Sequence, residues 1–333
     1  MRQITNFLIT KLGYSKQSKF IGTLGETSME TFIQTRNFIY KNARPLDRAR
    51  WDYLFEDASS QNVLARLSTF QNPDGGFAHA LEPDCWNVNS TPLQTWVATR
   101  ILKEVHLDDK NHPLIRGILR YLLSGHEFNG HIWNGLNTVP SNNDYPHAPW
   151  WSFTKTHETS YNPTASLTGF MLKYANNDSS SYGLACSIAK EAYIDLKKRF
   201  PLESMHEVAC YVELYEYLKE CNITQVIDLD EFKGLLHQQV DTILTRKTDT
   251  WNTDYVCKPS LFIKNKASDF YLGNKEICAF ELEFIRQTQR TDGTWDVAWS
   301  WDDYPEQWAI SKNWWKSDII IKNCAFVKAF ESE

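Results

Sequence analysis

The sequence predicts an all-α protein in which about ten to twelve helices follow one another as five or six pairs. Apolar residues recur at helical spacing in most segments; those of 167–174, for example, lie at i, i+3, i+4 and i+7. No stretch of useful length alternates apolar and polar residues as a half-buried β-strand does. One short motif also occurs twice, more than 200 residues apart. We therefore expect a single domain over 1–333, with 1–27 as an N-terminal extension.

Proline and glycine set the limits of the predicted helices. Pro92 opens one helix, and Pro201 separates two others. Residues 250–274 contain Pro259 and Gly273, which argue against one continuous helix there. The expected helices, in chain order, are 28–42, 47–55, 59–71, 90–101, 112–123, 162–174, 182–200, 203–218, 230–246, 275–289 and 319–330.

The repeated motif reads Gln, three residues, Gly, one residue and an aromatic residue. It occupies Gln71–Phe77 and Gln289–Trp295, and a shorter form without the glutamine occupies Gly130–Trp133. Each copy follows a segment with helical spacing and precedes a loop. The composition predicts a helix that ends in a turn supported by Asp and Gly, with the aromatic ring packed back on the helix end.

This motif resembles the glutamine–tryptophan repeat of the terpenoid cyclase and protein prenyltransferase superfamily, also known from squalene cyclases. The resemblance covers about 28–330 and implies an α/α toroid, in which outer and inner helices alternate around a central cavity that holds a small-molecule substrate. It also implies that the loops after the three corners, at 78–90, 134–161 and 296–316, gather at one mouth of that cavity.

The catalytic motifs of that superfamily are absent. The nearest match to the acidic run of the proton-initiated cyclases is Asp228–Glu231, where Asp230 is better interpreted as a helix cap. The surroundings of Cys85 and Cys257 lack the spacing of the prenyltransferase zinc ligands. We therefore expect no metal and no cofactor.

Composition limits the classes of partner. The chain has 333 residues, a net charge of −6 and no basic block, which argues against a nucleic-acid partner. Its seven cysteines are scattered, which favours reduced thiols and a cytoplasmic protein. Met1–Lys19 has no signal-peptide pattern, and no apolar run reaches the roughly 18 residues of a membrane span. Aromatic residues make up 14% of the chain, and 13 are Trp, which favours a thick core or a ring-lined cavity.

Two carboxylates in the first loop are the leading catalytic candidates. Glu82 and Asp84 flank Pro83, and two ionised carboxylates this close repel, which can raise one pKa enough for general-acid catalysis. The alternatives are two solvated loop acids, or Asp84 as the cap of the next helix. Asp74 and Asp292, inside the corner motifs, are better explained by hydrogen bonds within the turns.

The second loop contains a dense polar and aromatic cluster. His147 is a candidate acid, base or ligand between two prolines, and Asp144, Trp150 and Trp151 are candidates for substrate binding. The alternative is a packed loop with a hydrogen-bonded histidine. His157 and Glu158 are weaker candidates of the same kind.

The third loop combines tryptophans with two acids. Asp302 and Asp303 are candidate catalytic acids. Rings beside carboxylates suit a carbocation, and they equally suit a stacked sugar with two catalytic acids. The alternative is that the tryptophans seal the seam of the toroid. The substrate-binding candidates, with one from the first loop, are Trp86, Trp299, Trp301 and Trp308.

Three functions remain open. The resemblance implies an enzyme similar to terpenoid cyclases, which uses acid chemistry on an apolar or isoprenoid small molecule. Other α/α toroids are glycoside hydrolases or polysaccharide lyases, with acids and Trp at the mouth. The missing motifs favour a third function, a toroid that binds a ligand without catalysis, so that enzymatic activity itself is open. A deep apolar wall would indicate isoprenoids, and a cleft with paired acids would indicate glycans.

Overall fold

The computed structural model describes residues 26–154 and 160–331, and within these ranges the fold is all-α, as predicted. They contain eleven α-helices and no β-strand. The predicted extension lies almost entirely outside the described residues. The helices are α2 Glu26–Asn42, α3 Pro45–Phe55, α4 Ser60–Leu67, α5 Pro92–Glu104, α6 Pro113–Leu123, α7 Thr164–Tyr174, α8 Ser180–Arg199, α9 Met205–Glu220, α10 Leu229–Ile243, α11 Lys275–Thr288 and α12 Pro305–Glu331.

Three proline-initiated helices show why the boundaries fall where they do. Pro45, Pro92 and Pro113 each stand in the first turn, where a residue without an amide hydrogen is tolerated and φ is already helical. Thr91 caps α5 by accepting from the amide of Gln94 at 3.2 Å. The prolines and the capping threonine therefore determine where these helices begin.

Two sequence-based expectations need correction. The segment 296–316 was expected to be a loop, but α12 begins at Pro305 and continues for 27 residues, so Trp308 and Trp315 lie on a helix. Dense tryptophan and acidic residues hide the helical spacing there, while Pro305 marks the start. In the acidic run before α10, the capping residue is Asp228, whose side chain accepts from the amides of Asp230 and Glu231, and not Asp230.

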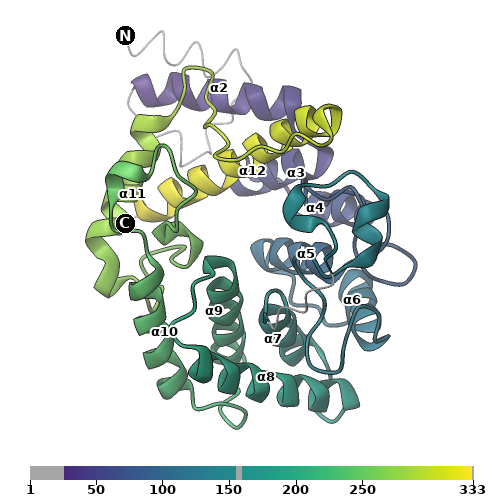
Figure 1. Ribbon diagram of the computed structural model, residues 1–333. Helices are drawn as coiled ribbons and strands as arrows, with labels where there is room; N and C mark the ends of the chain where they lie inside the picture. Colours follow the sequence, from purple (N-terminus) through teal and green to yellow (C-terminus); the bar gives the residue numbers. More distant parts are fainter. Residues whose placement is uncertain (1–25, 155–159, 332–333) are drawn as a thin grey trace.

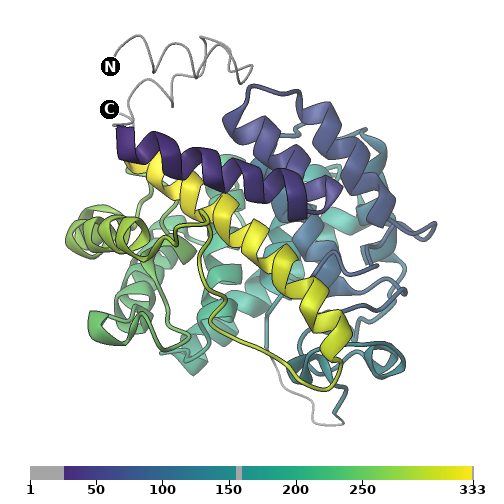
Figure 2. The same cartoon turned by 90° about the horizontal axis from the view of Figure 1, so that it is seen from above.

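The helices follow one another around a common centre, from α2 through α5 and α8 to α11 (Figure 1). α7 packs against both α5 and α9, and α10 packs against α9. The last helix, α12, contacts α2, α3 and α11, so the end of the described chain lies on its beginning. Figure 2 shows α12 crossing beside α2 along one side of the molecule.

The first copy of the glutamine motif forms the predicted turn after α4. Gln71 Nε2 donates to the carbonyl of Gly75 at 2.9 Å, and Asp74 Oδ1 accepts from the amide of Gly76 at 2.9 Å. Gly75 has φ of +99°, a conformation that favours glycine. Phe77 is fully buried. The turn role expected for Asp74 is therefore confirmed.

The second copy repeats these contacts after α11. Gln289 Nε2 donates to the carbonyl of Gly293 at 3.2 Å, and Asp292 Oδ1 accepts from the amide of Thr294 at 3.1 Å. The Trp295 indole donates back to the carbonyl of Ile285 in α11 at 2.9 Å. The predicted packing of the aromatic residue on its own helix is present here as well.

Each glutamine also reaches a helix beyond its own. Gln71 Nε2 donates to the carbonyl of Leu114 in α6 at 3.1 Å, and Gln289 Nε2 donates to Thr35 Oγ1 in α2 at 2.9 Å. The corner of α11 is thus joined to α2 as the corner of α4 is joined to α6. The glutamine of each corner therefore donates to a second helix, α6 for Gln71 and α2 for Gln289, and the second of these contacts joins distant parts of the chain.

Replacing Gly75 with alanine is expected to lower the free energy of unfolding by about 2–4 kcal/mol. A Cβ atom there would lie 2.1 Å from the carbonyl oxygen of Gly117, and the positive φ disfavours any L side chain. Gly183→Ala in α8 is the control, because its Cβ would meet nothing within 4 Å and alanine favours the helix by about 1 kcal/mol. Urea unfolding of both variants measures the difference; equal stability of the two would contradict the tight corner.

Candidate acid site

The buried ion pair of Arg44 with Asp47 fixes the backbone of the first loop, residues 78–90. Arg44, just before α3, donates to the carbonyls of Ala80 at 2.6 Å and of Leu81 at 3.2 Å, and pairs with Asp47 at 2.7 Å. The side chain of Gln94 in α5 accepts from the amide of Leu81 at 3.0 Å. These contacts fix the backbone immediately before Glu82.

Asp84 is bound by three tryptophan side chains. The indole N–H groups of Trp301 and Trp315 each donate to Asp84 Oδ1 at 2.7 Å, and that of Trp299 donates to Oδ2 at 3.2 Å. The Asp84 residue is only 2% exposed. Trp299 and Trp301 lie in the segment before α12, and Trp315 lies within α12. All three hydrogen-bond donors are therefore distant from Asp84 in the chain.

Two features of the surroundings of Asp84 shift its pKa in opposite directions. Burial raises the pKa of Asp84 above its usual value, while the three indole hydrogen bonds lower it. Because the indoles can only donate, they match an ionised carboxylate, which can only accept. Asp84 is neither a solvated acid nor a helix cap, since Thr91 caps α5.

Glu82 has a different environment. Burial, followed by the negative charge of Asp84, raises the pKa of Glu82 to about 8, although Lys322 opposes the shift. The Glu82 side chain is half-buried, and its carboxyl group accepts no hydrogen bond from any described residue, whereas its backbone carbonyl accepts from the amide of Cys85 at 3.0 Å. At neutral pH the proton therefore belongs to Glu82, and the pair consists of one neutral acid and one carboxylate held by donors.

An ion network adjoins Glu82. Lys322 pairs with Asp318 at 2.6 Å on α12, and Arg50 of α3 reaches the same carboxylate at 3.0 Å. Arg50 also binds Glu104 of α5 through two contacts of 2.8 Å each. The network joins three helices and keeps Lys322 near Glu82.

The described parts of the three predicted loops contact one another. Cys85 and His147 form an isolated backbone bridge, and the amide of Ala148 donates to the carbonyl of Asp84 at 2.8 Å. The rings of His147 and Tyr304 lie 5.8 Å apart. The loop that carries the acid pair therefore touches both others, as expected from the equivalent corners.

His147 holds the second loop together through its ring. Its Nδ1 lies 2.6 Å from the carbonyl of Tyr145, which can only accept, so Nδ1 carries the proton. Its Nε2 therefore accepts from Ser152 Oγ at 2.9 Å. Both nitrogens are occupied, which matches the alternative of a packed, hydrogen-bonded histidine. Asp144, one turn earlier, is exposed.

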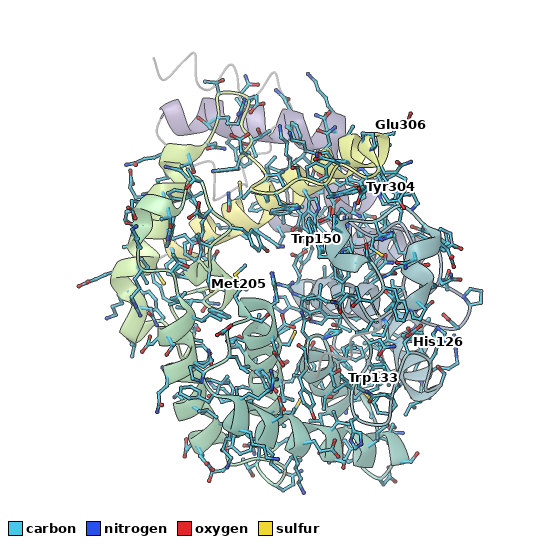
Figure 3. The ribbon with its side chains drawn as sticks, in the orientation of Figure 1. His126, Trp133, Trp150, Met205, Tyr304 and Glu306 are labelled. Atoms are coloured by element: carbon cyan, nitrogen blue, oxygen red, sulfur yellow. The ribbon has the colours of Figure 1, made fainter. Side chains whose placement is uncertain are left out.

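The other predicted site residues are divided between the surface and the core. Asp302 and Asp303 are exposed, and Trp150 is 37% exposed; Figure 3 shows Trp150 and Met205 near the middle of that view. Trp151 is buried, and its indole N–H has no partner among the described residues.

Trp86 connects the first loop with α12 through a hydrogen bond and a ring contact. Trp86 donates to Ser311 Oγ at 3.0 Å, and its ring stacks on Trp314 at 5.3 Å. Ser311 in turn donates to the carbonyl of Pro83 at 2.6 Å. Trp308 packs beside Trp301, with ring centroids 5.6 Å apart. These contacts place the predicted tryptophans around the acid pair, with Trp86 and Trp308 in supporting positions.

Charged side chains surround the interior next to the acid pair. Burial, followed by the positive charges of Arg100 and Lys322, lowers the pKa of Lys264 to about 8, although its side chain is exposed. The Lys264 amino group donates to the carbonyl of Ser260 at 2.5 Å. Arg100 of α5 pairs with Glu213 of α9 at 3.2 Å. Both cations therefore have partners within the chain.

The sequence carries no signal for three further residues close to the acid pair or to its tryptophans, Tyr255, His206 and Lys322. Tyr255 lies in the segment without helical spacing, and Lys322 lies in a helix that was interpreted only as core. The charges of Glu82 and Asp84 contribute, after burial, to raising the pKa of Tyr255 to about 12. The predicted candidates His157 and Glu158 lie outside the described residues.

Comparison of the chain with models of protein families, with curated proteins and with solved structures gave no match. All seven cysteines are unpaired. Within 26–154 and 160–331, no three His, Cys, Asp or Glu side chains converge as metal ligands would. In the same ranges no helix has the length and apolar character needed to cross a membrane.

Proposed function

We propose that this protein is an acid–base enzyme that cleaves glycosidic bonds, built on an α/α toroid. The observation that carries the proposal is the unequal pair of carboxylates. Glu82 is a neutral acid near pH 7, and Asp84 is a carboxylate held by three indole donors. Glycoside cleavage uses such a pair, one member to protonate and one to stabilise positive charge.

The toroid is supported by the corner contacts. Gln71 joins the corner after α4 to a backbone carbonyl of α6, and Gln289 joins the corner after α11 to a threonine hydroxyl of α2. In a ring of helix pairs, neighbouring corners are related in this way all the way around. The packing of α12 on α2 and α3 supports closure at the same seam.

In the proposed reaction Glu82 donates its proton to the leaving glycosidic oxygen as the carbon–oxygen bond breaks. Positive charge then develops on the sugar carbon and its ring oxygen, and the Asp84 carboxylate stabilises that charge through space. Since the oxygens of Asp84 already accept three hydrogen bonds, we assign it a fixed electrostatic role. Water adds to the carbon, and its proton returns to the Glu82 carboxylate.

A polar substrate is supported by the charged groups near Glu82. Lys264 and Arg100 lie near Lys322, which adjoins Glu82, and Glu82 needs contact with a basic oxygen in order to transfer its proton. Sugar hydroxyls can form hydrogen bonds with charged groups of this kind, whereas a hydrocarbon cannot. Among the functions left open by the sequence, the carbohydrate-active one therefore fits best.

The test is a panel of aryl glycosides and unlabelled oligosaccharides incubated with the wild-type protein and with Glu82→Gln. We expect turnover of at least one glycoside by the wild type, and a loss of about 10²-fold or more in the variant. Chromatography of the products identifies the bond that is cleaved. Absence of turnover across the panel, with conversion of an isoprenoid instead, would refute the glycosidase proposal.

A second proposal keeps an isoprenoid substrate. Its support is the group of rings next to Asp84: Trp299 lies 5.0 Å from Trp315 and 5.5 Å from Tyr255, measured between ring centroids. Aromatic faces stabilise carbocations, and a neutral carboxylic acid can begin such a reaction by protonating an alkene. Conversion of a linear isoprenoid to a cyclic product that depends on Glu82 would favour this proposal over the first.

A further inference from the structure

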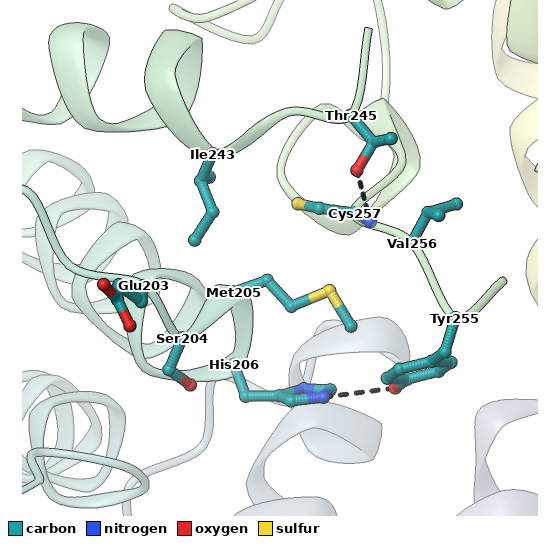
Figure 4. Close-up of a pocket in the computed structure, with 9 residues that line it drawn as sticks. All are labelled: Glu203, Ser204, Met205, His206, Ile243, Thr245, Tyr255, Val256 and Cys257. Carbon is teal, nitrogen blue, oxygen red and sulfur yellow. Dashed lines mark hydrogen bonds between the residues drawn. The ribbon is translucent and has the colours of Figure 1, made fainter. Parts of the chain in front are cut away.

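A separate pocket lies next to the acid site. It has a volume of about 360 Å³ and is formed by the first turn of α9 together with 243–245 and 255–257 (Figure 4). Its lining combines the apolar side chains of Met205, Ile243 and Val256 with the polar side chains of His206, Tyr255 and Thr245 and with the acid Glu203. This volume lies within the range of small-molecule sites, about 300–1,000 Å³.

Tyr255 and His206 form a hydrogen-bonded pair at this pocket. The Tyr255 hydroxyl lies 3.1 Å from His206 Nε2, and the rings are stacked with centroids 5.9 Å apart and an interplanar angle of 25° (Figure 4). Tyr255 is 56% exposed and lines the pocket, so part of its side chain is open to a ligand there. No hydrogen bond connects His206 Nδ1 with another described residue.

The same tyrosine connects the pocket to the acid pair. Its ring meets that of Trp299 edge to face, with centroids 5.5 Å apart. The Trp299 indole donates to Asp84 at 3.2 Å. A ligand in the pocket therefore lies one aromatic residue away from the tryptophan that binds the catalytic carboxylate.

The protonation of the pair decides which ligand group it accepts. Burial, followed by the positive charges of Arg100 and Lys322, lowers the pKa of His206, so the imidazole is neutral at pH 7. If Tyr255 donates to Nε2, then Nδ1–H is a free donor and the phenol oxygen a free acceptor. If Nε2–H donates, these roles are reversed. In either tautomer the pair offers one donor and one acceptor.

One donor with one acceptor matches a hydroxyl group, which both donates and accepts. An anionic group would need two donors, which this neutral pair does not provide. The apolar side chains of Met205, Ile243 and Val256 suit the carbon faces of a ring. Shape and hydrogen bonding therefore select an uncharged ring that carries hydroxyl groups.

We propose that this pocket is a substrate subsite for one neutral sugar ring adjacent to the bond that is cleaved, and that Tyr255 and His206 bind one of its hydroxyl groups. The subsite deepens the glycosidase proposal and rests on it for the identity of the neighbouring reaction. Tyr255 and His206 are specificity-determining residues in this assignment, and the proton transfer remains with Glu82.

Calorimetric titration with methyl glycosides of neutral hexoses tests the subsite. We expect millimolar binding by the wild type, about tenfold weaker binding by Tyr255→Phe, and no measurable binding by Ile243→Trp, which fills the pocket. Tyr271→Phe is the matched control, since Tyr271 lies outside the pocket and loses the same hydroxyl group. Glu82→Gln should bind within about twofold of the wild type.

The outcomes separate the subsite from the reaction. Equal binding by the wild type, Tyr255→Phe and Ile243→Trp would overturn the subsite, as would absence of binding at about 50 mM methyl glycoside. Tighter binding of glucuronate than of a neutral hexose by about tenfold would also overturn it. Binding that depends on Tyr255, combined with no hydrolysis of any glycoside, would support the subsite while the glycosidase proposal fails.

Discussion

Glu82→Gln is expected to lower turnover by about 10²-fold or more and at the same time to stabilise the folded protein increasingly as the pH rises toward about 8. Glutamine has nearly the same shape but no acidic proton, so the leaving oxygen is no longer protonated. We expect turnover by the wild type to fall as the pH rises through about 8, where burial and Asp84 place the pKa of Glu82. A pH–rate profile measures this limb directly.

The stability change has a defined sign. The pKa of Glu82 is about 8 in the folded protein against an ordinary value of 4.5, so between these values the folded state binds more protons than the unfolded state. The wild type therefore loses stability as the pH rises from 4.5 to about 8. Glutamine removes that loss, and we expect a gain of about 1–3 kcal/mol in the free energy of unfolding near pH 8.

A matched control for this variant is Glu306→Gln, which changes an exposed acid in the first turn of α12. Its turnover should remain within about twofold of the wild type. Urea unfolding at about pH 5 and about pH 8 should show a pH-dependent gain only for Glu82→Gln. Full activity of Glu82→Gln, or a stability gain independent of pH, would remove Glu82 from its assigned role.

Asp84→Ala is expected to cause the largest loss of stability, about 3–5 kcal/mol in the free energy of unfolding. The change leaves three indole N–H groups, of Trp299, Trp301 and Trp315, without their acceptor. Near-ultraviolet circular dichroism reports the tryptophan packing, and urea unfolding reports the stability. Asp302→Ala, an exposed acid nearby, is the control and should change stability by less than about 0.5 kcal/mol.

Asp84→Asn separates the structural and catalytic roles of this carboxylate. The amide keeps one oxygen for Trp301 and Trp315 and turns its NH₂ toward Trp299, so we expect a smaller loss of about 1–2 kcal/mol. The negative charge is absent, and turnover should fall by about 10²-fold or more. If Asp84→Ala proves as stable as Asp302→Ala, the tryptophans do not depend on Asp84.

The sequence was informative where chemistry is local. The corner motif predicted the turn at Gly75, and loop position together with paired charge made Glu82 and Asp84 the leading candidates. Asp84 and its indole donors are 215, 217 and 231 residues apart, and no local pattern predicts which tryptophans meet a given carboxylate. That outcome depends on where the packing of the helices places residues 299–315.

The same reason explains the candidates whose environment differed from expectation. His147 has the composition of a catalytic histidine, but its two ring nitrogens are used by Tyr145 and Ser152 within five residues of the chain. The sequence around Tyr255 does not indicate its position, because Tyr255 lies between short 3₁₀ turns. Such a segment has no periodicity from which the neighbours of a side chain could be predicted. The tertiary packing around a polar atom determines which hydrogen-bond partner that atom meets.

The contact between Thr35 and Gly293 has a consequence for how the chain is made. Thr35 Oγ1 donates to the carbonyl of Gly293 at 2.9 Å across 258 residues, so the seam forms only after nearly the whole described chain has been synthesised. At about 5–20 residues per second, α2 exists for roughly 13–50 s before its partner emerges from the ribosome. During that interval its apolar face, including Phe32 and Ile39, has neither α12 nor the second corner to cover it. We expect nascent chains that end before Gly293 to be bound by chaperones and sensitive to proteases, because non-local closure is slow and leaves apolar surface exposed.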